Sequence, residues 1–258
     1  MAQIDAGMLQ KSATWAESGR SPPQWCDAIP ACRLRHDASG SEKPYRAATR
    51  GGSTSDNKEE TMNDIKQIEE RPILHHVTLK TTRMEEMLAW YRAVVGCVPN
   101  FRFEGGAWTT NDTANHRVAL LQTPAIRNDP DKLHHAGMHH MAFEFATLDG
   151  LLANYARLAE AGILPHACLD HGLTTSFYYE DPDGNSVELQ CDNFGNWNLS
   201  SEWMRTSQEF VRNPIGEECD PPKMIAARKA GMSVAELHQR TRAGEFRPAV
   251  PGDLHLPV

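Results

Sequence analysis

The chain lacks the features of membrane, secreted and nucleic-acid-binding proteins. Its 258 residues contain no apolar run long enough to cross a bilayer. The first residues, MAQIDAGMLQKS, lack the apolar stretch of a secretion signal. Basic side chains are in the minority, and a formal net charge of -8 argues against a nucleic-acid or anionic-membrane partner. We therefore expect a cytoplasmic protein that binds neither nucleic acids nor membranes.

Cysteine is also scarce. The 6 cysteines form no CxxC pair. In a chain of this length they are typical of reduced thiols and not of a disulfide framework. The length suits one or two domains with a substantial hydrophobic core.

Residues 1–61 lack any sustained periodicity. They are rich in Ser, Gly, Arg and Pro, as in SGRSPPQW and ATRGGSTSDNKEE. Such a segment buries too little apolar surface to offset the entropy lost on ordering. We predict a disordered tail, or a start codon assigned too far upstream, with Met62 as the alternative start.

From about residue 72 the hydrophobic pattern becomes regular and occurs twice, in modules at about 72–122 and 137–191. Each module predicts a strand, an amphipathic helix and three more strands. The predicted strands are 73–80, 98–103, 106–111, 116–122, 138–145, 164–169, 174–180 and 184–191, and the helices are 83–96 and 148–162. This order predicts an α+β fold of two tandem βαβββ modules within 62–198, whose half-sheets form a cup. Residues 199–258 predict a helical extension, with helices near 200–211 and 233–244.

Strand parity selects three candidate metal ligands, because side chains alternate between the two faces of a strand. In ILHHVTL the apolar positions share a face with His75, which leaves His76 on the polar face. In GMHHMAFEF the same rule leaves His140 on the polar face and His139 on the other. In DPDGNSVEL it selects Glu188. We expect His75 and His139 to be packed or surface residues.

Two imidazoles and one carboxylate are the facial triad of non-haem Fe(II) oxygenases, which leaves open positions for substrate and O2. When the last strands of the two modules are aligned, Ala119 takes the position that corresponds to Glu188. The first module therefore has no carboxylate where a fourth ligand would stand. Three ligands favour a site that binds both a bidentate substrate and O2.

One stretch resembles a known family. The pattern of HGLTTSFYYEDPDGNSVELQCDNFGNW, with His-Gly, Ser-x-Tyr and Asp-Pro-Asp-Gly-Asn-x-x-Glu, is similar to that of type I extradiol catechol dioxygenases of the vicinal oxygen chelate superfamily. The one-domain enzymes that act on 2,3-dihydroxybiphenyl-like catechols are the most similar, and the resemblance covers roughly 70–220.

The resemblance implies Fe(II) bound by His76, His140 and Glu188, and a ring-opened hydroxymuconic-type product from a catechol and O2. It assigns His171 as an acid/base near bound O2 and Tyr178 as the residue that holds a catecholate oxygen. A homo-oligomer is expected. A further active-site histidine of larger relatives has no clear counterpart, although His134 or His135 could serve. The residues DPDG at 181–184 are a turn, and NPIG at 213–216 resembles a tail feature without assigned chemistry.

Three alternatives stay open. The same ligands accept Mn(II) as well as Fe(II). A glyoxalase-like lyase or isomerase shares the fold but would need a fourth ligand, which Ala119 does not supply. A metal-free drug-binding dimer also shares the fold but has no need of the triad.

Overall fold

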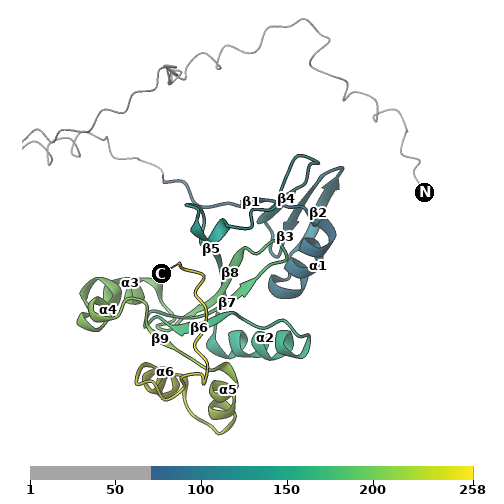
Figure 1. The fold of residues 1–258 in the computed structure, drawn as a ribbon. Helices are drawn as coiled ribbons and strands as arrows, with labels where there is room; N and C mark the ends of the chain where they lie inside the picture. Colours follow the sequence, from purple (N-terminus) through teal and green to yellow (C-terminus); the bar gives the residue numbers. More distant parts are fainter. Residues whose placement is uncertain (1–70, 258) are drawn as a thin grey trace, which may run out of the picture. The chain divides into compact units, whose positions relative to one another are not determined.

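The computed structural model describes residues 71–257 (Figure 1). The predicted tail at 1–61 and the alternative start at Met62 lie outside the described residues. Among the described helices, none is both long and apolar enough to span a membrane.

The first module follows the predicted order. Its elements are β1 (Val77–Lys80), α1 (Met84–Val95), β2 (Val98–Phe103), β3 (Gly106–Thr110) and β4 (Val118–Leu121). The strands form a mixed sheet in the order β1-β4-β3-β2, in which β1 and β4 are parallel. The first strand begins later than predicted, at Val77, and Ile73 is 87% exposed. The predicted apolar face therefore packs only from Val77 onward.

The second module repeats the order with β5 (His140–Glu144), α2 (Leu148–Glu160), β6 (Ala167–Asp170), β7 (Thr174–Glu180) and β8 (Ser186–Asp192). Its mixed sheet has the order β5-β8-β7-β6-β9, and β5 is parallel to β8. The two modules thus form two separate sheets, and the four strands of each module have the same order, with β9 added to the second sheet. The predicted α+β class and tandem modules are confirmed.

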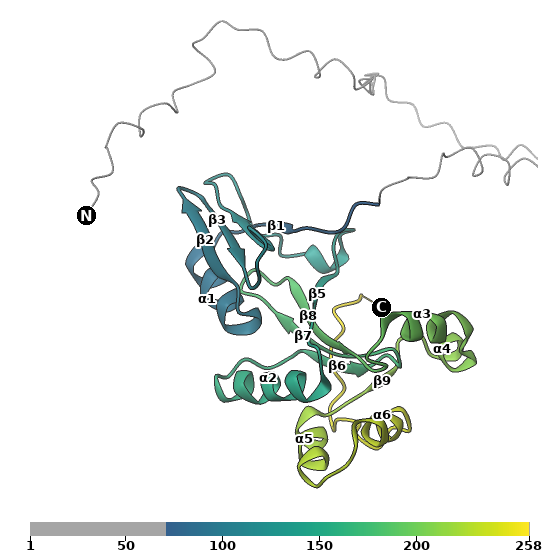
Figure 2. The ribbon, with the colours of Figure 1, turned by 180° about the vertical axis from the view of Figure 1, so that it is seen from behind.

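Local signals explain the helix bounds. In α1 the buried residues Met87, Leu88, Tyr91 and Val94 recur at helical spacing, so one stripe faces the core. The helix ends at Gly96, which adopts the left-handed conformation with φ 74 that glycine tolerates. Helix α2 begins after Thr147, whose side chain accepts a hydrogen bond from the amide of Gly150. Figure 2 shows α1 beside the strands of the first sheet and α2 beside those of the second.

The two modules share one hydrophobic core. It contains Met87 and Leu120 of the first module and Leu151, Phe177 and Leu189 of the second, all fully buried. Burying each such side chain contributes roughly 1.5–3 kcal/mol. The hydroxyl of Tyr91 also donates to the buried Asp181 carboxylate at 3.0 Å. The predicted DPDG turn therefore also ties the second module to α1.

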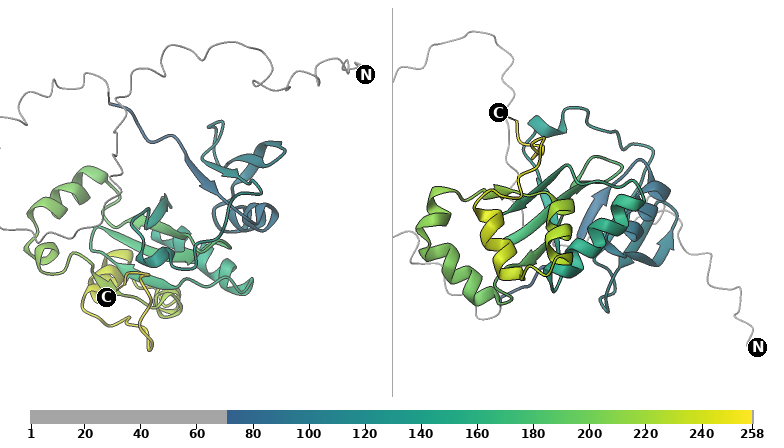
Figure 3. Two further views of the ribbon diagram at one scale, coloured as in Figure 1. Left: turned by 45° about the horizontal axis from the view of Figure 1, so that its top comes forward. Right: turned by 90° about the horizontal axis from the view of Figure 1, so that it is seen from below.

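The C-terminal extension is more elaborate than predicted. It contains α3 (Trp197–Thr206), α4 (Gln208–Arg212), β9 (Glu217–Glu218), α5 (Pro221–Lys229) and α6 (Val234–Arg242). The predictions missed α5, although Asp220 caps it and Pro221 opens it, which is a helix-start signal. They also missed β9, because two residues are too short to show a period. Helix α5 packs against α2, and α6 lies beside α5 and against β6 (Figure 3).

Candidate active site

Strand register brings the polar side chains of the second module together. Strand β7 pairs Tyr178 with Glu188, and β5 pairs Ala142 with Glu188. Directly paired residues present their side chains on the same face of a sheet. His140 lies two residues before Ala142 in β5 and so shares that face. Parity therefore selected the correct face for His140, Tyr178 and Glu188.

Glu188 is at the centre of this face. Its Oε2 lies 3.0 Å from Nε2 of His140, and its Oε1 accepts a hydrogen bond from the Tyr178 hydroxyl at 3.1 Å. The residue is only 6% exposed. Burial alone would raise the pKa of the Glu188 carboxyl, but hydrogen bonds with His140 and Ser176 outweigh it and hold the pKa below its ordinary value. Glu188 is therefore an anionic carboxylate held inside the fold.

His171 extends the group. It lies between β6 and β7, and its Nε2 is 2.8 Å from the Tyr178 hydroxyl. Burial lowers the pKa of His171, which favours the neutral imidazole. Burial raises the pKa of Tyr178, and the charge of Glu188 raises it further. A neutral histidine thus faces a tyrosine that keeps its proton.

His139 orients His140 in this structure. Nε2 of His139 lies 2.9 Å from the backbone oxygen of Leu254, which can only accept a hydrogen bond. The proton of a neutral His139 is therefore on Nε2, and its Nδ1 accepts from Nδ1 of His140 at 2.7 Å. Protonated His140 can then donate from Nε2 to Glu188, whereas neutral His140 directs the lone pair of Nε2 at the carboxylate. The expectation of a merely packed or surface His139 misses this contact, because Leu254 is far away in the sequence.

The pair formed by His140 and Glu188 fits a metal ion. A lone pair and a carboxylate oxygen 3.0 Å apart need a cation, a proton or a metal, to hold them together. Neighbouring ligands of an octahedral ion with bonds of about 2.1 Å lie about 3 Å apart. The donor set of imidazole and carboxylate also suits iron.

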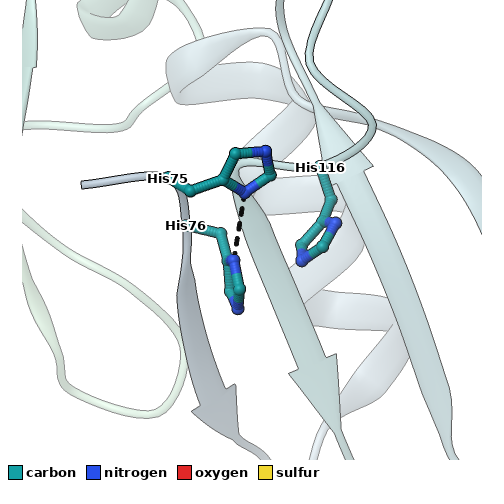
Figure 4. A group of neighbouring side chains, drawn as sticks. All are labelled: His75, His76 and His116. Atoms are coloured by element: carbon teal, nitrogen blue, oxygen red, sulfur yellow. Dashed lines mark hydrogen bonds between the residues drawn. The ribbon is translucent and has the colours of Figure 1, made fainter. Parts of the chain in front are cut away.

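His76 lies in a different group, just before β1 in the first module. Its Nδ1 is 3.1 Å from Nδ1 of His75, and its ring centroid is 4.2 Å from that of His116 (Figure 4). The ligand atoms of these three histidines lie within 4.8 Å of one another. Within 71–257 no other group of three or more His, Cys, Asp or Glu residues is as close, so His76, His140 and Glu188 do not form such a group.

The structure therefore brings together four of the five predicted site residues, His140, His171, Tyr178 and Glu188, and places His76 with other histidines. The ligand role of His76 stays a prediction. Sequence reasoning missed His116, although a signal existed. His116 stands two positions before Val118, as His75 stands two before Val77, and the structure pairs Val77 with Val118.

His134 and His135 lie in the loop between the modules. His134 ends a 3-10 helix over Lys132–His134. Nδ1 of His134 contacts Asp131 and Nδ1 of His135 contacts Asp129, both at 2.6 Å. Among the described residues, neither forms a hydrogen bond or ion pair with the group around Glu188. The question of a further active-site histidine stays open.

Comparison with known proteins identifies the family of this chain. The family model described as "Glyoxalase/Bleomycin resistance protein/Dioxygenase superfamily" matches residues 73–189. The chain is 39% identical over 183 residues to biphenyl-2,3-diol 1,2-dioxygenase 2 of Rhodococcus globerulus, covering 71% of this chain and 95% of that protein. It is 37% identical over 172 residues to biphenyl-2,3-diol 1,2-dioxygenase 3 of the same organism, covering 67% and 90%. The chain belongs to this superfamily.

Within it, the chain groups with the extradiol dioxygenases, so the predicted family and enzyme class are confirmed. A glyoxylase/bleomycin resistance protein/dioxygenase domain from Frankia sp. EAN1pec is 17% identical, covers 48% of this chain and 93% of that chain, and has a TM-score of 0.41.

The strand pairing within each sheet also confirms the predicted alignment of the two modules. Thr78 pairs with Ala119 as Ala142 pairs with Glu188. Ala119 therefore occupies the position equivalent to Glu188.

Proposed function

We propose that this protein uses Fe(II) and O2 to cleave the ring of a catechol beside its two hydroxyls, giving a hydroxymuconic-type product. The buried contact between His140 and Glu188, continued through Tyr178 to His171, is the observation that carries the proposal. The names of the two Rhodococcus relatives support a catechol that bears a second aromatic ring. Aromatic-compound degradation is the corresponding role.

Three residues would hold the iron: His140 and Glu188 from the second module and His76 from the first. The 3.0 Å between Nε2 of His140 and Oε2 of Glu188 supports binding of one ion by both residues. His76 and His140 precede equivalent positions, because Val77 pairs with Val118 as Met141 pairs with Val187. Iron binding would draw His76 out of its group with His75 and His116. Mn(II) remains the alternative metal, since the same ligand types accept it.

When bound, Fe(II) acts as a Lewis acid that lowers the pKa of the catechol hydroxyls and provides coordination positions for substrate and O2. The protein's own residues handle the protons. Tyr178 keeps its hydroxyl proton because of burial and the Glu188 charge, so it can donate a hydrogen bond to a substrate oxygen. His171 is neutral for the same reason of burial, so its Nε2 can accept a proton and return it.

The predicted cellular location, the predicted oligomeric state and the lyase alternative also belong to this proposal. Cytoplasmic location is supported by Cys97, Cys168, Cys191 and Cys219, which are all free thiols. The homo-oligomer stays a prediction. The absence of a carboxylate at Ala119 disfavours a lyase that needs ligands from both modules.

Anaerobic purification with added Fe(II), followed by a screen of catechol, 3-methylcatechol and 2,3-dihydroxybiphenyl, tests the proposal. We expect a yellow product that requires O2, with the biaryl substrate preferred. Parallel loading with Mn(II) identifies the metal. Iron-loaded protein that binds these catechols but never opens their rings would refute the proposal, and a Glu188→Gln variant controls for free iron.

A further inference from the structure

The segment Asn213–Gly216, the NPIG of the C-terminal extension, lies against His171. It leads from α4 into β9, and β9 pairs with β6 through Asp170 and Glu217. Because His171 directly follows β6, this pairing carries the segment to the histidine. The backbone oxygen of Ile215 lies 2.6 Å from Nδ1 of His171.

The segment fits this place closely. Gly216 has a φ of 92, and a Cβ there would lie 2.1 Å from the oxygen of Asp170 and 2.7 Å from Cα of His171. Only glycine fits such a conformation and such an approach. The Asn213 side chain braces the turn: its Oδ1 accepts from the Gly216 amide at 2.9 Å, and its Nδ2 donates to the Gly216 oxygen at 2.8 Å. The position of the Ile215 carbonyl is thus set by Gly216 and by the side chain of Asn213.

A backbone oxygen accepts hydrogen bonds and cannot donate them. A proton must therefore occupy Nδ1 of His171, since the opposite tautomer would place a lone pair against the oxygen of Ile215. In neutral His171 the free lone pair is then on Nε2, 2.8 Å from the oxygen of the Tyr178 hydroxyl. That hydroxyl has a single proton, which it can donate either to Nε2 of His171 or to Glu188.

We propose that Asn213–Gly216 is a positioning segment that holds His171 as the Nδ1–H tautomer and so makes Nε2 the nitrogen that exchanges protons with the site. The catalytic consequence rests on the proposed ring cleavage. The tautomer itself does not, because it follows from contacts among the protein's own groups. The helical extension thereby takes part in the active site without contacting substrate.

Nuclear magnetic resonance of the full chain labelled with 15N-histidine tests this directly. The nitrogen shifts of a histidine ring distinguish a nitrogen that carries a proton from one with a lone pair. The His171 signals are assigned by their loss in His171→Gln. In the wild type at neutral pH we expect a proton on Nδ1 and a lone pair on Nε2. A neutral His171 with its proton on Nε2 would overturn the proposal without any variant.

Asn213→Ala removes the brace and keeps the rest of the motif. We expect a mixture of tautomers at His171, and a kcat reduced by up to about 100-fold with iron content and KM retained. Asn111→Ala is the matched control, because the Asn111 amide donates to the oxygen of Val95 in the first module and loses a similar contact. It should leave tautomer and kcat unchanged.

The two hypotheses fail separately. If no catechol is turned over, the proposed function fails, but the ring-nitrogen spectra still report on the segment. If folded Asn213→Ala shows the wild-type tautomer and wild-type kcat, the segment is not a positioning element, although ring cleavage stands.

Discussion

The two βαβββ modules share their topology and their strand register but differ in chemistry. At the position where the last strand of the second module carries Glu188, the first module carries Ala119, which is 1% exposed. The first module therefore supplies one candidate ligand, His76, and the second supplies two. A repeat of this kind keeps the fold of both copies while placing the anionic candidate ligand in only one.

The modules also differ in what covers them. Every residue of β2 is exposed, and Phe101 stacks with both Phe103 and Trp108 on the first sheet. In the second sheet, β7 and β8 are largely buried, and β9 extends the sheet beyond β6. The extension packs on the second module, where low exposure strengthens the electrostatic interactions of Glu188. The exposed aromatic rings of the first module offer apolar area to a flat ligand.

Each module begins with a histidine doublet, and in each the two Nδ1 atoms are in contact, at 3.1 Å in the first and 2.7 Å in the second. In the second module Leu254 anchors the doublet through His139, whereas in the first the partner ring is that of His116. In the second doublet the orientation of His140 is thus fixed by a backbone contact, as the proposed ligand role needs. In the first doublet His76 contacts His75 and His116, and it would have to move away from them to bind the proposed iron.

Replacing Glu188 gives the largest expected effect. Glu188→Gln substitutes a neutral amide for the anionic ligand, so we expect iron binding and ring cleavage to be abolished or greatly weakened. Metal analysis of the purified variant, with kinetics on iron-supplemented protein, measures both. Iron content and activity near those of the wild type would contradict the ligand role.

The ligand histidines come next and test whether both modules serve one metal. His76→Ala and His140→Ala should each remove most of the bound iron, because each deletes a neutral imidazole ligand. Iron binding by anaerobic titration provides the measurement. Loss of iron in His140→Ala alone, with His116→Ala and His76→Ala unaffected, would restrict the metal site to the second module.

His171→Ala separates proton transfer from metal binding. The variant should keep its iron and still bind catechol, yet turn over about 10²–10⁴-fold more slowly, as is typical for a positioned acid/base. Steady-state kinetics and anaerobic catechol binding on iron-loaded protein distinguish the two roles. A variant with wild-type turnover would remove His171 from the mechanism.

Substitution of the other histidine in each doublet, His139 or His75, tests whether the two doublets differ in their effect on iron binding. His139→Ala should weaken iron affinity by about 10–100-fold, because it removes the group that orients His140. His75→Ala should change iron affinity much less, since His75 lacks the equivalent of the Leu254 contact among the described residues. Equal effects of the two substitutions on the iron dissociation constant would show that the doublets are equivalent.

Tyr91→Phe gives the smallest effect and tests the contact between the modules. The change removes the hydrogen bond to Asp181, which keeps its bond from the Asn185 side chain at 2.8 Å. We expect a loss of about 1 kcal/mol in the free energy of unfolding, with iron affinity unchanged. Urea denaturation measures it. An unaltered midpoint would mean that the core, and not this bond, holds the modules together.

Local periodicity predicted much of this protein. Strand parity and helical spacing extend over only a few residues, and they identified the two modules, the polar face of β5 and β8, and the equivalence of the Ala119 and Glu188 positions. The sequence motif around His171 and Tyr178 identified the protein family. These features follow from alternation and turn chemistry, which act between near neighbours in the chain.

Only the tertiary structure decided which distant groups meet. His171 contacts Ile215, 44 positions away, and His139 contacts Leu254, 115 positions away. No periodic pattern encodes such pairs, because they depend on how the extension docks on the second sheet. For the same reason parity placed His76 on the polar side of its strand, while the late start of β1 left it beside His75 and His116. The sequence alone determined which face of a strand each side chain occupies. The packing of segments far apart in the sequence decided which groups those side chains contact.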